Sequence, residues 1–177
     1  AGKPTARQLA GARILVVDDS ATSRLFLRGQ LEEWGALPEE APDAPSALSL
    51  ARAAADAEEP FTVALVDMLM PQTDGIVLGR SFQADPRLAA TRLVLMTSED
   101  RQERRLEEDG FVCGLSKPVR SADLFECLLA ALRGQPRPRV RSGSRPRAEL
   151  RRDNVRVLLA EDSGTNQQVA LGILRKA

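Results

Sequence analysis

Three aspartates in this chain each come directly after a short apolar run, as residues at the ends of buried strands do: Asp18, Asp19 and Asp67. In a shared crevice, carboxylates repel each other by about 4 kcal/mol per pair at 4 Å and an effective dielectric near 20. A hard divalent cation relieves this repulsion, and Mg²⁺ prefers one or two carboxylates together with water and phosphate oxygens. An aspartate beside such a cation can attack a phosphoryl group and form an aspartyl phosphate.

Two further polar residues, Thr97 and Lys117, follow apolar runs and would assist this reaction. The transition state of phosphoryl transfer accumulates charge on the equatorial oxygens, so a site needs positive charge and hydrogen-bond donors around them. Lys117 can supply the charge, and the Thr97 hydroxyl can donate. Taken singly these residues are commonplace, and an Asp-Asp pair after a strand is more often a turn than a metal site. Their occurrence in order at predicted strand ends indicates a phosphoryl-transfer site.

The elements that must position these residues alternate short apolar runs with helical patterns, which indicates a parallel sheet built from βαβ units. In such α/β sheets the reactive crevice lies beyond the carboxyl ends of the strands. We expect strands at residues 14–17, 36–41, 63–66, 93–96 and 114–116. Pro38 cannot donate to a strand ladder, so the second strand is expected at an edge of the sheet.

The predicted helices follow these strands in turn. They comprise a stripe of Phe26, Leu27, Leu31 and Trp34, then Ser46–Ala57, a helix from Gly75 to before Pro86, Asp100–Asp109, and a helix capped by Ser121. We expect Trp34 to lie in the core. The Asp100–Asp109 helix has Leu106 as its only large apolar residue, so it is expected to be short and more mobile than the last helix.

Composition narrows the class of protein. The chain has 25 basic and 25 acidic residues, so no global field favours nucleic acid or an anionic membrane. No apolar run approaches the roughly 20 residues that cross a bilayer, and we expect a cytoplasmic protein without membrane contact. Cys113 and Cys127 are expected to be buried, reduced thiols. The chain has no histidine, which excludes histidine-dependent triads, and any phosphohistidine donor would lie outside it.

We divide the chain into four parts: an N-terminal tail (1–12), an α/β domain (13–133), a linker (134–152) and a partial second domain (153–177). The linker is rich in arginine and proline and cannot bury a core, although a nucleotide or phosphate site on its arginines is an alternative. Arg156–Thr165 repeats the pattern of Arg13–Thr22 and predicts the first β-α unit of a second such domain. Its apolar residues, Val157 to Leu159 among them, are expected to be buried against a second copy, giving a homodimer, or against the first domain.

Residues 13–133 resemble a response-regulator receiver domain of two-component signalling. The resemblance lies in Asp18-Asp19-Ser20, Val66-Asp67-Met68-Leu69-Met70-Pro71, Asp74-Gly75, Met96-Thr97-Ser98 and Ser116-Lys117-Pro118. It implies a flavodoxin-like, doubly wound fold with a parallel five-stranded sheet of order 2-1-3-4-5. It further implies that Asp67 is the phosphoacceptor and that Thr97 and Lys117 hold the phosphoryl oxygens. By the same resemblance Asp19, Asp67 and the Leu69 carbonyl hold Mg²⁺, Asp18 acts mostly through water, and the Lys117–Pro118 peptide bond is cis.

The implied function is that of a phosphorelay module fed by a histidine kinase or a histidine phosphotransfer domain. Such a domain catalyses its own phosphorylation and hydrolysis. Glu161-Asp162 and the residues around it resemble the start of receivers at the end of hybrid sensor histidine kinases, so a hybrid kinase is the expected parent chain.

Two departures from the receiver pattern leave an alternative open. Gly114 stands where receivers usually carry Tyr or Phe, and the stretch from 97 to 110 is about two residues short. The alternative is a binding-only pseudo-receiver that regulates kinase domains by docking or by binding a nucleotide second messenger. A metal-dependent phosphatase with an aspartate nucleophile is a third class, but it usually needs Asp-x-Asp where this chain has Asp18-Asp19-Ser20.

Overall fold

The structure is a computed structural model that describes residues 9–71, 73–97, 106 and 108–134. All of these lie in the first of the two units into which the chain divides, residues 1–139. The predicted linker beyond Gly134, the partial domain of 153–177 with its expected buried residues, and most of the predicted Asp100–Asp109 helix lie outside the described residues. No helix in the described part of the chain is long and apolar enough to cross a membrane.

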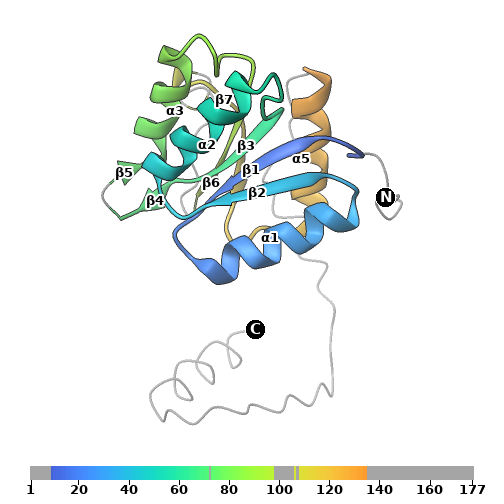
Figure 1. Ribbon diagram of the computed structural model, residues 1–177. Coiled ribbons are helices and arrows are strands. Elements are labelled where there is room, and N and C mark those ends of the chain that lie inside the picture. The colour runs from blue at the N-terminus through green and yellow to red at the C-terminus, as the bar shows by residue number, and fades with distance from the viewer. Residues whose placement is uncertain (1–8, 72, 98–105, 107, 135–177) are drawn as a thin grey trace, which may run out of the picture. The chain divides into compact units, whose positions relative to one another are not determined.

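Parallel strands and intervening helices alternate along the chain, as the sequence predicts (Figure 1). The elements are β1 (Arg13–Val17), α1 (Ala21–Glu33), β2 (Leu37–Ala41), α2 (Ala44–Asp56), β3 (Val63–Asp67), β4 (Leu69–Met70), β5 (Thr73–Asp74), α3 (Gly75–Ala84), β6 (Arg92–Thr97), β7 (Phe111–Ser116) and α5 (Ser121–Arg133). Five strands form one parallel sheet in the order β2-β1-β3-β6-β7, which is the predicted flavodoxin-like order. β2, with Pro38, lies at the edge and pairs only with β1, as expected.

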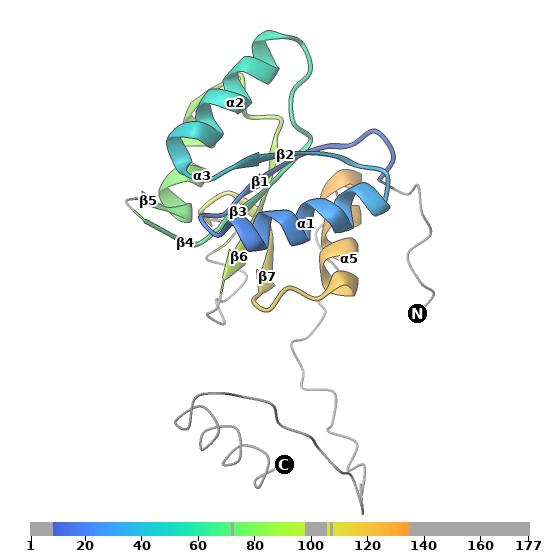
Figure 2. The ribbon, with the colours of Figure 1, turned by 60° about the horizontal axis from the view of Figure 1, so that its bottom comes forward.

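Alternation of side chains along the strands builds a core on each face of the sheet, because successive strand residues point to opposite faces. On one face Leu15, Val66 and Leu95 pack under α2 and α3; on the other Ile14, Leu65 and Met96 pack under α1 and α5. Figures 1 and 2 show these two helix pairs on opposite sides of the sheet. The sheet is therefore covered on both sides, and its two ends carry the exposed loops.

Helix α1 buries a narrower stripe than the sequence predicts. Leu27, Leu31 and Trp34 are buried, and the ring of Trp34 meets Phe125 of α5 edge-on at 5.0 Å, which confirms the core position expected for Trp34. Phe26, which the prediction placed in the same stripe, is 53% exposed. The side chains of Leu27, Leu31 and Trp34 already fill the buried face of the helix, so Phe26 lies beside that face.

Two local predictions are corrected by the structure. Ser121 does not cap α5, since Arg120 is at the N-cap without a side-chain hydrogen bond, and the Ser121 hydroxyl instead accepts from Gln30 Nε2 of α1 at 2.5 Å. Cys113 of β7 and Cys127 of α5 are joined in a disulfide and are not the reduced thiols that we expect from the sequence. The packing of α5 on β7 brings their Cα atoms to 6.4 Å, within the range of a disulfide.

Candidate functional site

The three aspartates singled out in the sequence come together at the carboxyl ends of two neighbouring strands. Asp67 is the last residue of β3, and Asp18 and Asp19 follow β1, which pairs with β3 in parallel. One carboxylate oxygen of each residue lies within 4.8 Å of the others. The Asp18 and Asp67 side chains are buried and Asp19 is exposed. The sheet therefore assembles an acidic cluster that opens to solvent on the Asp19 side.

Hydrogen bonds from the backbone fix the turn that carries Asp18 and Asp19. The Asp18 N–H donates to the Ala41 carbonyl at the end of β2, at 3.3 Å. The Asp18 carboxylate accepts from the Ser20 N–H at 2.9 Å, and the Ser20 hydroxyl accepts from Ser23 N–H at 3.3 Å to cap α1. The start of α1 is thereby tied to the acidic cluster.

Close backbone packing holds the loop after Asp67. The Met68 N–H donates to the Met96 carbonyl, and the Gly75 N–H donates to the Met68 carbonyl, at 2.8 and 2.9 Å. A Cβ on Gly75 would lie 2.3 Å from the carbonyl oxygen of Asp67, so only glycine fits at this position. Asp74 then caps α3 by accepting from the Ile76 N–H at 2.9 Å.

Lys117 follows β7, the edge strand opposite β2, and its side chain reaches the acidic cluster. Its Nζ lies 2.8 Å from Oδ2 of Asp67 and 3.0 Å from Oδ2 of Asp18, and its N–H donates to the Thr97 carbonyl at 2.8 Å. The Lys117–Pro118 peptide bond is cis, as expected from the resemblance. The ammonium group thus lies between two buried carboxylates.

Burial and this ion pair act on the titration of the cluster in opposite directions. Burial raises the pKa of Asp67, and the hydrogen bond from Lys117 lowers it by less, so the pKa stays above its ordinary value. For Lys117, burial by itself lowers the pKa, but the carboxylates of Asp67 and Asp18 outweigh it and the pKa is raised. The charged form of Asp67 is therefore incompletely compensated by Lys117 alone.

Thr97 and Leu69 are placed at the same end of the sheet. Thr97 ends β6, is buried, and its hydroxyl donates to the Met68 sulfur at 3.2 Å. Leu69, in β4, presents an exposed side chain, and its N–H donates to Oδ1 of Asp67 at 3.4 Å. All the residues predicted for the site are thus within the described chain and lie around Asp67.

The position of the missing aromatic residue, Gly114, is covered by a side chain that comes from before β7. A Cβ on Gly114 would lie 2.6 Å from Cδ1 of Leu106, which is itself buried. Leu106 therefore occupies the space into which a larger side chain at 114 would point.

The chemistry of the cluster fits Mg²⁺. All three donors are carboxylate oxygens, which are hard ligands of the kind that Mg²⁺ prefers. Lys117 meets two of the three carboxyl groups, and a divalent cation would offset the mutual repulsion of the cluster. The exposed side of Asp19 leaves room for the waters that Mg²⁺ retains.

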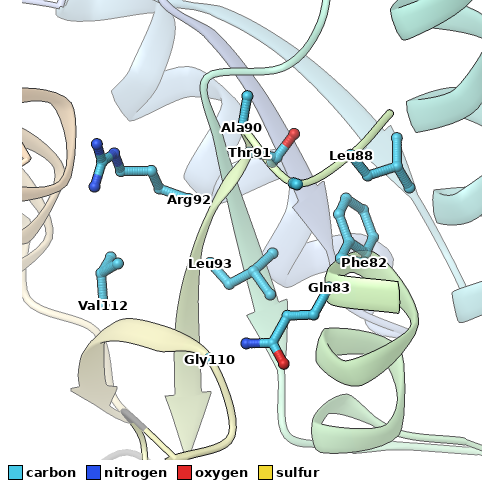
Figure 3. Close-up of a pocket in the computed structure, with 10 residues that line it drawn as sticks. Phe82, Gln83, Leu88, Ala90, Thr91, Arg92, Leu93, Gly110 and Val112 are labelled. Atoms are coloured by element: carbon cyan, nitrogen blue, oxygen red, sulfur yellow. The ribbon is translucent and has the colours of Figure 1, made fainter. Parts of the chain in front are cut away.

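A pocket of about 350 Å³ lies at the opposite end of the sheet, where β6 and β7 begin. Figure 3 shows Leu93 between Phe82 and Val112, with the guanidinium of Arg92 directed away from Phe82 and Leu88. The pocket contains none of the residues of the acidic cluster, so the candidate site is the carboxyl end of the sheet.

One residue near the cluster was missed by the sequence analysis. Arg24 of α1 donates from Nη1 to the carbonyl oxygens of Asp18 and Asp19, at 2.6 and 3.1 Å. The signal in the sequence is a basic residue one helical turn after the Ser20 cap, at a position where the side chain can reach back to the preceding turn.

Comparison with known proteins gives one consistent relationship. The family model of the response regulator receiver domain matches residues 14–129. The protein PilH of Pseudomonas aeruginosa is 30% identical over 125 residues, which cover 70% of this chain and 99% of PilH. The response regulator PleD of Caulobacter vibrioides is 31% identical over 170 residues, which cover 89% of this chain but 36% of PleD. The structure of the chemotaxis protein CheY4 of Vibrio cholerae superposes with a TM-score of 0.62 at 26% identity, covering 70% of this chain and all of CheY4.

Proposed function

Because this chain belongs to the response regulator receiver domain family, we propose that residues 13–133 accept a phosphoryl group on Asp67 in a cytoplasmic phosphorelay. The observation that carries the proposal is the buried Asp67 carboxylate, which lies 2.8 Å from Lys117 and within 4.8 Å of the other two carboxylates. An aspartate so placed has a cation on one side and a candidate metal site on the other. The donor is the phosphohistidine of a histidine kinase or a histidine phosphotransfer domain.

The reaction is a displacement at phosphorus. An oxygen of the Asp67 carboxylate forms the new O–P bond while the P–N bond to the donor imidazole breaks. The imidazole leaves with the electrons of that bond and takes up a proton from solvent. The product is an aspartyl phosphate, which water later hydrolyses to restore the carboxylate.

Lys117 and Thr97 would each interact with a different oxygen of the transferred phosphoryl group. Lys117 is in contact with Asp67 before the reaction and can move with a phosphoryl oxygen as charge develops, while the Thr97 hydroxyl donates to another. Asp19, Asp67 and the Leu69 carbonyl would hold Mg²⁺, with Asp18 acting mostly through water. When bound, Mg²⁺ supplies positive charge to the phosphoryl oxygens and the carboxylates.

We place this module in a hybrid sensor histidine kinase with tandem receivers. The support for tandem receivers is the repeat of Arg13–Thr22 at Arg156–Thr165, together with the alignment to the response regulator PleD, which extends beyond residues 14–129. The support for a kinase parent is the resemblance of the residues around Glu161-Asp162 to receivers of hybrid kinases. In this arrangement residues 134–152 link two receivers, and 153–177 begin the second. A homodimer through that segment, and the absence of nucleic-acid binding expected from the zero net charge, belong to the same proposal.

Phosphorylation by a small donor tests the proposal. With acetyl phosphate and Mg²⁺ the chain should gain one phosphoryl group, seen by intact-mass spectrometry, and Asp67→Asn should abolish the gain. Asp56→Asn is the matched control, because Asp56 is an exposed aspartate of α2 whose described partner is Arg87. Unchanged labelling of Asp67→Asn would falsify the assignment.

The binding-only pseudo-receiver is the second candidate, and Gly114 with Leu106 packed against it is the observation that favours it. It predicts no phosphoryl gain in the wild-type chain. The same experiment therefore separates the two functions.

A further inference from the structure

We propose that Arg24 is a positioning residue for the candidate metal site, acting through the backbone of Asp18 and Asp19. The inference rests on the proposed function, in which those two residues contribute to Mg²⁺ binding. Within the described chain Arg24 makes no hydrogen bond or ion pair with the carboxylates of the cluster. It acts instead on the peptide groups that carry them.

Arg24, in the first turn of α1, reaches back to the turn formed by Asp18 and Asp19, which we call the acidic turn. We call the hydrogen bonds that it makes there the clamp. Nη1 of Arg24 donates to the Asp18 carbonyl at 2.6 Å and to the Asp19 carbonyl at 3.1 Å. Its Nε donates to Oε2 of Glu40 at 3.3 Å. The side chain is only 15% exposed, so these bonds are largely shielded from competing water.

Asp19 is the residue that depends on this clamp most. Its carboxylate makes no recorded hydrogen bond or ion pair within the described chain, whereas that of Asp18 is held by Ser20 N–H and Lys117. The direction of the Asp19 side chain is therefore set by its own backbone. Because Arg24 holds the carbonyls of the two peptide groups that flank the Asp19 Cα, it fixes the direction in which the Asp19 side chain leaves the backbone.

Glu40 of β2 holds the clamp in place. It accepts from Arg24 Nε, and its other oxygen lies 2.9 Å from Nη1 of Arg28. Glu40 thus holds the Nε side of the Arg24 guanidinium, while Arg28 meets the other oxygen of Glu40 and makes no hydrogen bond or ion pair with Asp18 or Asp19 in the described part of the chain. The two arginines share this partner, but only Arg24 reaches the Asp18 and Asp19 carbonyls, which makes Arg28 a matched control.

A purely electrostatic role for Arg24 makes the opposite prediction. A guanidinium near three carboxylates repels a divalent cation, so its removal would strengthen metal binding. A positioning role requires the planar, forked geometry of arginine, which the ammonium of lysine does not reproduce. Arg24→Lys keeps the charge and removes the fork, and so distinguishes the two roles.

The experiment measures Mg²⁺ binding by calorimetry, and Mn²⁺ binding by electron paramagnetic resonance, on the full chain. We expect Arg24→Lys and Arg24→Ala each to weaken binding about tenfold, the size typical of groups that orient metal ligands. Arg28→Ala should leave the affinity unchanged. Circular dichroism melts confirm that the variants are folded, and amide exchange at Asp19 and Ser20 in metal-free protein should be faster in both Arg24 variants than in Arg28→Ala.

The outcomes separate this inference from the proposed function. If the wild-type chain binds neither Mg²⁺ nor Mn²⁺, the metal-dependent function is wrong and this inference with it. If the wild type binds but Arg24→Lys binds equally well, only the positioning role is overturned. Stronger binding by Arg24→Ala would overturn it in favour of simple charge repulsion.

Discussion

The ammonium group of Lys117 lies 2.8 Å from Oδ2 of Asp67, although Asp67 ends β3, Lys117 follows β7, and β6 lies between these two strands. The same ammonium lies 3.0 Å from Asp18. One cation therefore lies between the two buried carboxylates of the site.

Replacing Lys117 by Met should have opposite effects on metal binding and on phosphorylation. Without the ammonium, the carboxylates of Asp18 and Asp67 repel each other, so the metal-free protein should lose about 1–3 kcal/mol of stability. Mg²⁺ should bind more tightly and restore most of that loss. Labelling by acetyl phosphate should fall about a hundredfold, because a cation that stabilises the transferred oxygens is gone.

Melts with and without Mg²⁺, calorimetry and intact-mass kinetics check this prediction. Arg120→Met, which removes an exposed cation nearby, is the control and should change none of the three. A Lys117→Met variant that labels at the wild-type rate would contradict the role given to this residue.

Asp67→Asn should stabilise the metal-free protein at pH 7. Burial raises the pKa of Asp67 above its unfolded value, so its contribution to stability is present below the unfolded pKa and is lost as pH rises through the folded pKa. Asparagine does not titrate, and with asparagine at position 67 Lys117 keeps its ion pair with Asp18. We expect a melting temperature higher by about 2–4 °C, which is what roughly 1 kcal/mol produces in a chain of this size.

The dependence of this stability difference on pH shows whether it comes from the negative charge of Asp67. The difference between Asp67→Asn and wild type should shrink as the pH is lowered toward the ordinary carboxyl pKa, and it should also shrink when Mg²⁺ is added at pH 7. Melting curves in EDTA at a series of pH values give the measurement. A pH-independent difference would point to packing instead of charge.

Gly114 and Leu106 should be energetically coupled. Gly114→Ala places a Cβ 2.6 Å from Cδ1 of Leu106, an overpacking that should cost about 1–3 kcal/mol. Leu106→Ala removes the obstructing methyl group but leaves a cavity, at a cost of about 2–5 kcal/mol. In the double variant the alanine at 114 meets no obstruction. The loss of unfolding free energy in this variant should therefore be smaller than the sum of the losses in the two single variants. Denaturant unfolding of the four proteins checks this, and simple additivity would show that Leu106 does not fill the space over residue 114.

Phe26 should contribute to docking of the phosphohistidine donor. It lies on α1, which begins at the acidic turn, and it is 53% exposed beside Leu25, which is 58% exposed. Exposed aromatic side chains are common anchors of protein interfaces. Phe26→Asp should slow phosphoryl transfer from a phosphorylated histidine phosphotransfer domain about tenfold or more and leave labelling by acetyl phosphate unchanged.

Val77→Asp is the matched control for this prediction. Val77 is 52% exposed but lies on α3, on the other face of the sheet. Rapid-quench transfer assays compare the two variants with wild type. Equal slowing by both substitutions would place the docking surface elsewhere.

The order of elements and the composition of the site could be predicted from local sequence. Apolar runs of strand length, each followed by a polar residue, predict parallel strands whose ends carry Asp18, Asp67 and Thr97, because strand ends of a parallel sheet lie at one edge. Pro38 predicts the edge strand, because proline lacks the N–H that an inner strand must donate. These features depend on periodicity and on the backbone chemistry of single residues, and both can be read along the chain.

Only the tertiary structure decided which side chains far apart in the sequence pair with one another. The hydroxyl of Ser121 bonds to Gln30 and does not cap its own helix; Cys113 and Cys127 pair because α5 packs on β7; and Phe26 is exposed because Leu27 and Leu31 already fill the buried face. The clamp from Arg24 onto the Asp18 carbonyl is likewise invisible to a periodic pattern. Lys117 reaches Asp18 across 99 residues, and a contact of that separation is fixed by the packing of helices on a twisted sheet, which no local preference encodes.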